Sequence, residues 1–468
     1  MPWRFRLRGI CATIGVVGPS ERLVLKATSQ SVACGRVLSQ WLDAWLRLIG
    51  RHPILLPTLV GACLACTSLD VGFVLEDFTF LANLREQHYE NPALDLYRFS
   101  AIDSDEQTRW MDQGILPWWT SPGLHMSFFR PLSASLIALD FALFDDMAVP
   151  YHVHSIVWFA LTLIALGLVL QRVLSPVTAG LALLLFALDP LHAVSVSWMA
   201  NRNAWVAAMP ALLGFAAYLR WRIEGWRPGI LLAPLGLATG LMGGEAALAV
   251  MGYFVAFEVW GRQEPPLRRL AALAPLLVVL CAWAAACVVA DVGVSSGAGM
   301  YEDPFRHPGG WLAAALQRLL LLLSGISLHL PLDLWIWGPG WQMALSIGGL
   351  VGLALLAFLG WRLRGSMRDD EPSTLRWLLP GTAMSLVPAL SAMPMGRLLL
   401  FPAIGSAVLI AILLLAWRRC FSARPWGVTL GILLMTFMHP GLALPGWVLQ
   451  TNWLRASCER SIAVARDM

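Results

Sequence analysis

Residues 398–417 read LLLFPAIGSAVLIAILLLAW and contain no charged side chain. A helix needs roughly 20 apolar residues to cross a hydrocarbon core about 30 Å thick. Backbone N–H and C=O groups find no water in lipid and must be paired within their own segment, so such a run is a helix. This stretch alone therefore predicts a membrane-spanning helix.

Comparable apolar runs recur from about residue 53 to about residue 449. The 468 residues are 58% hydrophobic and only 13% charged, and the mean hydropathy is +0.66. A soluble chain would carry about a quarter charged residues. We therefore predict an all-α integral membrane protein with about 11 transmembrane helices. The predicted spans are 53–74, 150–171, 176–191, 204–221, 229–242, 246–260, 271–290, 341–361, 375–393, 398–417 and 426–449.

Charged residues divide between the two sides of this arrangement. Arginine clusters at 220–227, 262–269, 362–368 and 418–424 all fall on one side. The positive-inside rule places that side, together with the N-terminus, in the cytoplasm. Lys26 is the only lysine, which we interpret as the codon usage of a GC-rich genome. We expect the inner (cell) membrane of a bacterium. The acidic residues near span ends fall on the other side: Glu76, Asp77, Glu245, Glu302 and Asp303.

The same reading divides the chain into three parts. Residues 1–52 are expected to be a basic cytoplasmic leader, residues 53–449 the membrane domain, and residues 450–468 a C-terminal tail. Two long stretches of the membrane domain are expected on the periplasmic side. Residues 75–149 form a first periplasmic loop with short surface helices, and residues 291–340 a second periplasmic segment whose apolar part lies at the interface or re-enters the membrane. Loops this long are usually functional.

Two adjacent acids are the first candidates for catalysis. Glu76 and Asp77 lie where the first span ends. Such a pair can simply mark the exit from the membrane. It can also supply a general base at the bilayer surface, and repulsion between the two carboxylates raises the pKa of one of them.

Three arginines run against the positive-inside bias. Arg130, Arg202 and Arg397 lie on the predicted periplasmic side. The planar guanidinium matches the oxygens of a phosphate, so these residues are candidates for binding one. The simpler interpretations are snorkelling or ion pairs with the loop acids.

The other candidates are Glu245, His152 and His192. Glu245 follows two glycines inside an apolar stretch and is costly there unless it faces a polar cavity. The two histidines are more often structural than ligands. No metal-ligand spacing, phosphate-binding glycine loop or nucleophile elbow is present. The sequence identifies no cofactor and leaves a divalent-cation requirement open, and a net charge of +4 does not argue for nucleic acid.

Acids, arginines and histidines thus converge on the periplasmic face. Phosphate-binding arginines beside an acid at that interface suit an amphiphile whose phosphate lies at headgroup level. A polyprenyl-phosphate sugar is such a molecule.

Several segments resemble the GT-C superfamily of polyprenyl-phosphate-dependent glycosyltransferases, in the branch of the transmembrane and tetratricopeptide-containing O-mannosyltransferases and their bacterial relatives. No tetratricopeptide pattern follows the last span, and Gly244 stands where the family has a lysine. The matching segments follow the family's order: Leu75-Glu76-Asp77-Phe78; Phe129-Arg130-Pro131-Leu132, Leu143-Phe144 and Pro150-Tyr151-His152; Asp189-Pro190-Leu191-His192 with Asn201-Arg202-Asn203; Gly244-Glu245; and Gly396-Arg397-Leu398 with Phe401-Pro402.

The resemblance implies an inverting transfer of sugar from a polyprenyl-phosphate donor to a protein, lipid or glycan acceptor. By this carry-over, Glu76 or Asp77 deprotonates the acceptor, and Arg397 holds the donor phosphate together with Arg130 or Arg202. Two alternatives stay open. One is a transporter or flippase of a lipid-linked or anionic substrate, and the other is a non-catalytic scaffold of the same fold.

Overall fold

The computed structural model describes residues 40–86, 91–101, 103–112, 116, 118–295, 301–304, 307–420 and 425–467. The chain divides into two units, Met1–Leu48 and Ile49–Met468. Residues 40–48, the described part of the first unit, are helical, and the predicted leader up to residue 39 lies outside the described residues. Everything below concerns the second unit.

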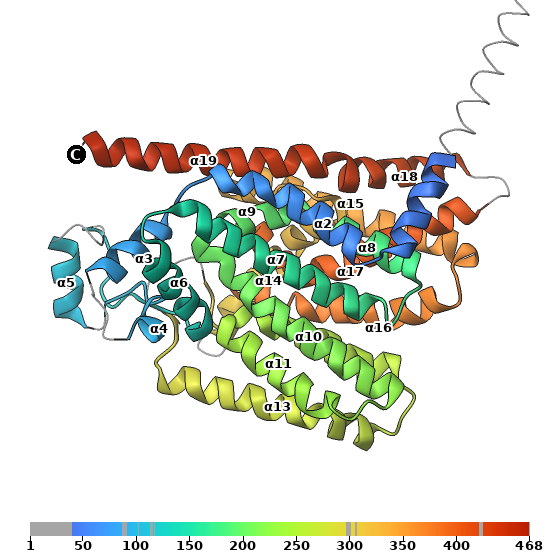
Figure 1. The fold of residues 1–468 in the computed structure, drawn as a ribbon, viewed down its shortest axis with the longest axis horizontal. Coiled ribbons are helices and arrows are strands. Elements are labelled where there is room, and N and C mark those ends of the chain that lie inside the picture. The colour runs from blue at the N-terminus through green and yellow to red at the C-terminus, as the bar shows by residue number, and fades with distance from the viewer. Residues whose placement is uncertain are drawn as a thin grey trace, which may run out of the picture. The chain divides into compact units, whose positions relative to one another are not determined.

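The second unit is a bundle of apolar helices (Figure 1). Among the described residues, six helices are long and apolar enough to cross a membrane, or up to eight if each of two bent helix pairs is one span. The predicted class, an all-α integral membrane protein, is confirmed, whereas the predicted count of about 11 spans is not. The helices of the bundle are α2 (Leu55–Ala65), α7 (Ala148–Leu170), α8 (Pro176–Leu188), α9 (Ala193–Ser197), α10 (Asn203–Glu224), α11 (Gly229–Gly243), α12 (Val250–Ala256), α13 (Pro266–Val289), α14 (Pro308–Leu328), α15 (Pro339–Leu363), α16 (Asp370–Ser385), α17 (Leu400–Arg419), α18 (Trp426–Thr436) and α19 (Leu442–Asp467).

The lower count has a local cause. Helix α11 has only 15 residues and α16 only 16, and residues 245–261 are broken into a 3-10 turn, α12 and a π-helical turn. None of these pieces is long enough to count as a membrane span by itself. Helix α11 lies against α10 at a close approach of Gly236 and Gly214, where a Cβ on Gly236 would stand 2.6 Å from the Gly214 Cα. Small residues at helix contacts are typical of membrane bundles.

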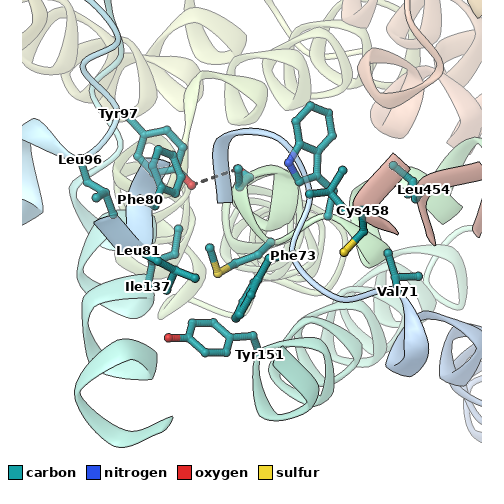
Figure 2. Close-up of a cluster of buried hydrophobic side chains, with 14 of the residues drawn as sticks. Val71, Phe73, Phe80, Leu81, Leu96, Tyr97, Ile137, Tyr151, Leu454 and Cys458 are labelled. Carbon is teal, nitrogen blue, oxygen red and sulfur yellow. Dashed lines mark hydrogen bonds between the residues drawn. The ribbon is translucent and has the colours of Figure 1, made fainter. Parts of the chain in front are cut away.

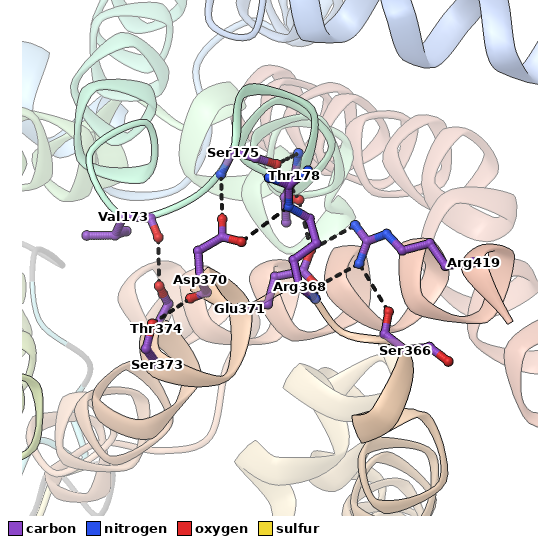
Figure 3. A network of polar contacts seen from close by, with 10 residues as sticks. All are labelled: Val173, Ser175, Thr178, Ser366, Arg368, Asp370, Glu371, Ser373, Thr374 and Arg419. Atoms are coloured by element: carbon purple, nitrogen blue, oxygen red, sulfur yellow. Dashed lines mark hydrogen bonds and ion pairs between the residues drawn. The ribbon is translucent and has the colours of Figure 1, made fainter.

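The helix ends rich in arginine meet at one end of the bundle (Figure 3). The buried Glu371 carboxylate accepts hydrogen bonds from both terminal nitrogens of Arg419, at 2.7 and 3.0 Å, and from the Thr178 hydroxyl at 3.1 Å. Asp370 accepts from the Ser175 backbone N–H at 3.1 Å. These contacts join α8, α16 and α17 and bring Arg368 and Arg419, from two of the predicted arginine clusters, to what we call the inner end.

The opposite, outer end carries the segment 75–149 (Figure 1). As predicted, it contains short helices: α3 (Glu76–Arg85), α4 (Pro92–Asp95), α5 (Ser104–Asp112) and α6 (Pro131–Phe144). Strand β1 (His125–Ser127) pairs antiparallel with β2 (Gly293–Ser295), with Met126 opposite Val294. The pairing ties this segment to the one that follows α13.

A hydrophobic cluster supports the outer end from within (Figure 2). The Phe73 and Tyr151 rings meet edge to face at 5.3 Å, and Leu454 and Cys458 of α19 complete the cluster. Helix α19 therefore continues through the boundary at residue 449 where the sequence predicted a tail to begin. A continuous helix there is stabilised because its later turns bury side chains against the outer segment.

After helix α14, the chain returns to the end of the bundle from which that helix started. Helix α14 runs beside α15 in the same direction, since Gln317 bonds Gln342 at 2.9 Å, Gly349 lies against Leu320, and Gly352 lies against Ser327. The α14 helix ends at His329, whose φ is +51°, opposite the middle of α15. Residues 329–338 then lead back to the start of α15. Whether this segment re-enters the membrane or lies at the interface stays a prediction.

Candidate active site

Glu76 is presented by a strained turn. The preceding residue, Leu75, has a φ of +49°, and α3 begins at Glu76. Such a conformation costs a non-glycine residue about 1–3 kcal/mol and is often found at functional sites. The Glu76 Oε2 atom is buried and has no hydrogen-bond partner among the described residues. Burial raises the pKa of Glu76, against smaller effects of a backbone hydrogen bond and of the Arg397 charge, which both lower it.

Asp77, by contrast, is held by the backbone. Its side chain is fully buried, and its two oxygens accept hydrogen bonds from the Val74 N–H at 3.0 Å and the Ala200 N–H at 2.7 Å. Burial raises the pKa of Asp77 to about 7 although these bonds act against it. Asp77 thereby joins the start of α3 to the turn before α10. Of the two adjacent acids, only Glu76 has an oxygen that is not committed.

Arg397 lies in the 3-10 turn η9 (Gly396–Leu399), near enough to Glu76 for its charge to act on that carboxyl. Its guanidinium carbon stands 5.5 Å from the centre of the Trp198 ring. Its charge lowers the pKa of three acids, Glu76, Glu245 and Asp333. No carboxylate oxygen in the described part of the chain lies within 4.0 Å of it. Arg397 is thus a cation with acids around it and no direct ion-pair partner.

Asp333 is a member of this group that the sequence did not single out. It lies in the 3-10 turn η6 (Leu332–Trp337), on the return path from α14. Burial raises the pKa of Asp333, and the Arg397 charge counters this effect. The neighbouring Leu332 packs in one cluster with Leu399, which brings η6 and η9 together. An acid just after a long apolar helix was the available signal.

Arg130 and Glu245 form an ion pair at the same end. The Arg130 Nε donates to Glu245 Oε2 at 2.9 Å, and a second nitrogen contacts Oε1. The guanidinium carbon also lies 4.8 Å from the centre of the Tyr97 ring and 4.5 Å from that of Phe128. Burial would raise the pKa of Glu245, but the Arg130 charge and hydrogen bonds lower it overall. Glu245 is therefore not a lone carboxylate, and Arg130 is not a free cation.

Arg202 is part of the protein core. Its side chain is only 1% exposed and forms an ion pair of 2.6 Å with Asp140. The same carboxylate contacts His154 Nδ1 at 2.8 Å. This position leaves Arg202 without access to a substrate phosphate. The sequence gave no indication of Asp140, which lies within the apolar helix α6.

The two candidate histidines are also buried. The His152 Nε2 atom lies 3.0 Å from the Gly72 carbonyl oxygen. The His192 ring packs 4.4 Å from Phe186 and 5.1 Å from Trp205, centre to centre. Both therefore contribute to packing. Within the stretches that the structure describes, no group of three or more His, Cys, Asp or Glu side chains is arranged to hold a metal ion, and the open question of a divalent cation stays untested.

The second outer segment contacts the first outer segment and the turn that carries Arg397. Tyr301 forms a β-bridge with Ala392, just before Arg397 in the chain, and its ring lies 5.8 Å from that of Phe128. The Trp311 indole N–H donates to Ser391 at 3.0 Å. Together with the β1–β2 pair, these contacts link both outer segments to the turn that carries Arg397.

No protein-family model matches the chain. Among curated proteins, it is 23% identical over 404 residues to protein O-mannosyl-transferase TMTC3 of Mus musculus, and 23% identical over 399 residues to the Homo sapiens protein of the same name. The chain is a distant relative of these O-mannosyl-transferases.

The relationship covers 77% of this chain but 42% of the mouse O-mannosyl-transferase, and 75% against 41% for the human one. The chain thus spans about two fifths of the length of these relatives. The resemblance to an O-mannosyltransferase branch that the sequence predicted is confirmed at this distance.

Proposed function

We propose that this protein is a membrane glycosyltransferase that moves a sugar from a polyprenyl-phosphate-linked donor to an acceptor at the outer end of the bundle. One observation supports this most. Glu76 has an oxygen without a hydrogen-bond partner, and it feels the charge of Arg397, which has no direct ion-pair partner among the described residues. The relatives are named protein O-mannosyl-transferases, so mannose and a protein hydroxyl are the first donor sugar and acceptor to test.

The proposed reaction is a single inverting displacement. The Glu76 carboxylate takes the proton from the acceptor hydroxyl, and the acceptor oxygen forms a bond to the anomeric carbon. The bond from that carbon to the phosphate oxygen breaks, and polyprenyl phosphate leaves with the electron pair. A positioned base contributes a factor of about 10²–10⁴ to the rate of such a step. Burial suits Glu76 to this role because it raises the pKa of the carboxyl toward the working pH.

Arg397 is proposed to bind the departing phosphate. A guanidinium stabilises the negative charge that grows on the leaving oxygens, and does so more strongly where water is excluded. The Arg130 guanidinium already binds the Glu245 carboxylate. Its proposed role is to connect the first outer segment to the turn that carries Glu245. Arg202, buried against Asp140, is proposed to be structural.

The membrane location fits this chemistry. A polyprenyl donor resides in the bilayer, and its phosphate lies at headgroup level. The acids and Arg397 lie at one end of the helices, where such a phosphate would be. The arginine-rich inner end supports a cytoplasmic inner side in a bacterial inner membrane, with the reaction on the periplasmic side.

A second candidate, a transporter, is favoured by one observation. Asp189 and His329 form a contact of 3.0 Å inside the bundle, with side chains only 5–6% exposed. The His439 ring lies 3.8 Å from that of His329. Ionisable groups buried among membrane helices often line a substrate or proton path. Burial of ionisable groups among the helices is the feature that a transporter needs and a glycosyltransferase does not.

The test is reconstitution of the purified protein in liposomes with a labelled polyprenyl-phosphate mannose and a serine- and threonine-containing peptide. The proposal predicts label in the peptide and free polyprenyl phosphate in equal amounts. Movement of the labelled lipid or of an anion across the bilayer, with no label in any acceptor, would instead favour the transporter.

A further inference from the structure

Helix α14 leaves a groove in the inner half of the bundle. It ends at His329, opposite the middle of α15. From that point toward the inner end, residues of α15, α16 and α17 line a groove. The space left has a volume of about 560 Å³, within the range of ligand-binding clefts. Its lining is almost entirely aliphatic and includes Leu353, Leu356, Leu375, Leu379 and Leu409.

The hydroxyl groups that line the groove already have hydrogen-bond partners. Each of three hydroxyls donates to a helix carbonyl, so none needs a polar ligand: Ser327 to Leu323 at 2.6 Å, Thr382 to Leu378 at 2.9 Å, and Ser406 to Ile326. Protein interiors are close-packed, and water occupies a cavity only where it finds polar partners. In a membrane, hydrocarbon chains are therefore the occupant that this lining accepts.

The inner mouth of the groove is cationic. Arg376 lines it and is exposed, and no acid in the described part of the chain lies within 4.0 Å of it. Trp361, 58% exposed, lies at the same mouth, and the Arg362 guanidinium carbon stands 5.5 Å from its ring centre. Trp at the membrane–water interface and arginine beside it are typical partners of lipid headgroups.

The three acids that precede Arg376 in the chain have other surroundings. Asp369 and Asp370 line a separate hollow with Arg172 and Ser175, and Glu371 is buried against Arg419 (Figure 3). They do not neutralise Arg376. The groove therefore combines a hydrocarbon slot with a positive mouth at one membrane surface.

We infer that the groove between α15 and α16 binds one anionic phospholipid of the inner leaflet, with an acyl chain in the slot and the phosphate at Arg376. The site lies at the end of the bundle opposite Glu76 and Arg397. It needs no sugar donor and does not depend on the proposed transferase activity. Its lipid fills the gap that is left where α14 ends.

Two glycines of α15 give a matched pair of variants. A Cβ added at Gly360 or at Gly340 meets no atom within 4 Å, so both positions accept a large side chain. Gly360 lines the groove and Gly340 does not. Gly360→Trp fills the slot, and Gly340→Trp is its control. Arg376→Gln removes the charge at the mouth, and Arg268→Gln, another exposed arginine of the inner end, is the control for charge.

The experiment measures binding of phosphatidylglycerol and phosphatidylcholine to the full chain by native mass spectrometry from detergent. We expect one retained phosphatidylglycerol, lost in Gly360→Trp and kept in Gly340→Trp. Arg376→Gln should weaken this binding about fivefold, the effect of one basic residue at an anionic lipid surface, and Arg268→Gln should not. Because Arg376 is exposed, its variant keeps the test decisive if Gly360→Trp does not fold.

Three outcomes would overturn the inference. One is equal retention of phosphatidylglycerol and phosphatidylcholine. Another is the same lipid loss in Gly360→Trp and Gly340→Trp, with Arg376→Gln unchanged. The third is a polyprenyl phosphate held in the groove where phosphatidylglycerol is not, which would assign the slot to the sugar donor.

Discussion

Arg130 and Glu245 form a two-pronged ion pair that joins the first outer segment to the turn between α11 and α12. The pair brings a loop arginine and a carboxylate from a glycine-rich turn into one rigid unit beneath the aromatic rings of Tyr97 and Phe128. It also explains why a carboxylate is tolerated at the end of an apolar helix, because the guanidinium compensates its charge.

Breaking this pair should destabilise the outer end. We expect Arg130→Ala and Glu245→Ala each to lower the free energy of unfolding by about 1–3 kcal/mol, less than for a fully buried pair because Glu245 is 41% exposed. Thermal unfolding of the purified variants measures this effect. The double variant should lose less than the two single variants combined. Strictly additive losses would show that the two residues do not interact.

Removing the charge of Arg397 should shift the pH dependence of transfer. Arg397 lowers the pKa of Glu76, so in Arg397→Gln that pKa is higher. A base works only when deprotonated, and the rising limb of the plot of kcat/KM against pH should therefore move to higher pH. Loss of a phosphate contact should also lower kcat/KM by about 10²–10³.

Arg397→Lys is the control for charge. In this variant the rising limb of kcat/KM against pH should stay at the wild-type position, because the positive charge is kept. The value of kcat/KM should fall in part, because an ammonium lacks the planar shape of a guanidinium. A limb that does not move in Arg397→Gln, together with an unchanged KM for the donor, would argue against Arg397 facing both Glu76 and the phosphate.

Asp77 should make stability fall with rising pH. Its pKa is raised to about 7 in the folded chain from 3.8. The folded state therefore binds more protons between about pH 4 and 7, and this contribution to stability is lost as the pH rises through 7. The unfolding temperature should therefore drop between about pH 4 and 7 and level off above that range. In Asp77→Asn this pH dependence should be weaker.

The same variant should be less stable at every pH. An amide has one oxygen, so one of the two backbone N–H groups at Val74 and Ala200 loses its partner, at a cost of about 1–3 kcal/mol. A pH dependence as steep in Asp77→Asn as in the wild type would assign the titration to another group.

Arg202 should matter for folding rather than for binding. Arg202→Gln removes the arginine partner of the buried Asp140 carboxylate and leaves it only the contact with His154, at a cost of about 3 kcal/mol. We expect poor expression and a lower unfolding temperature, as in Asp140→Asn. A well-folded Arg202→Gln protein with a raised KM for the donor would instead show that Arg202 binds the donor phosphate.

The membrane fold could be predicted from the sequence because hydropathy and arginine placement report directly on the bilayer. The number of spans could not. Helix α11 and residues 245–261 are apolar enough to suggest spans, yet glycines and close helix contacts shorten or break them. Tertiary packing decides where such helices end, and the hydropathy of a segment does not predict that packing.

The site was predictable in part. Glu76 and Arg397 were singled out from charges at span ends, and their catalytic roles stay predictions; the structure adds that Glu76 has a buried oxygen without a hydrogen-bond partner and feels the Arg397 charge. Arg130 and Glu245 were recognised singly, since nothing in the sequence shows that residues 115 positions apart form a pair. Asp77 and Arg202 look as available as Glu76 and Arg397 in sequence. Only their burial and hydrogen bonds separate structural residues from candidate catalytic ones.

The most direct test compares Glu76→Gln with Asp105→Asn, an exposed acid of the same outer segment, in the liposome transfer assay. Glu76 as the base predicts a fall in kcat of about 100-fold or more for Glu76→Gln, with an unchanged unfolding temperature, and no change for Asp105→Asn. Transfer at the wild-type rate by Glu76→Gln would contradict the account.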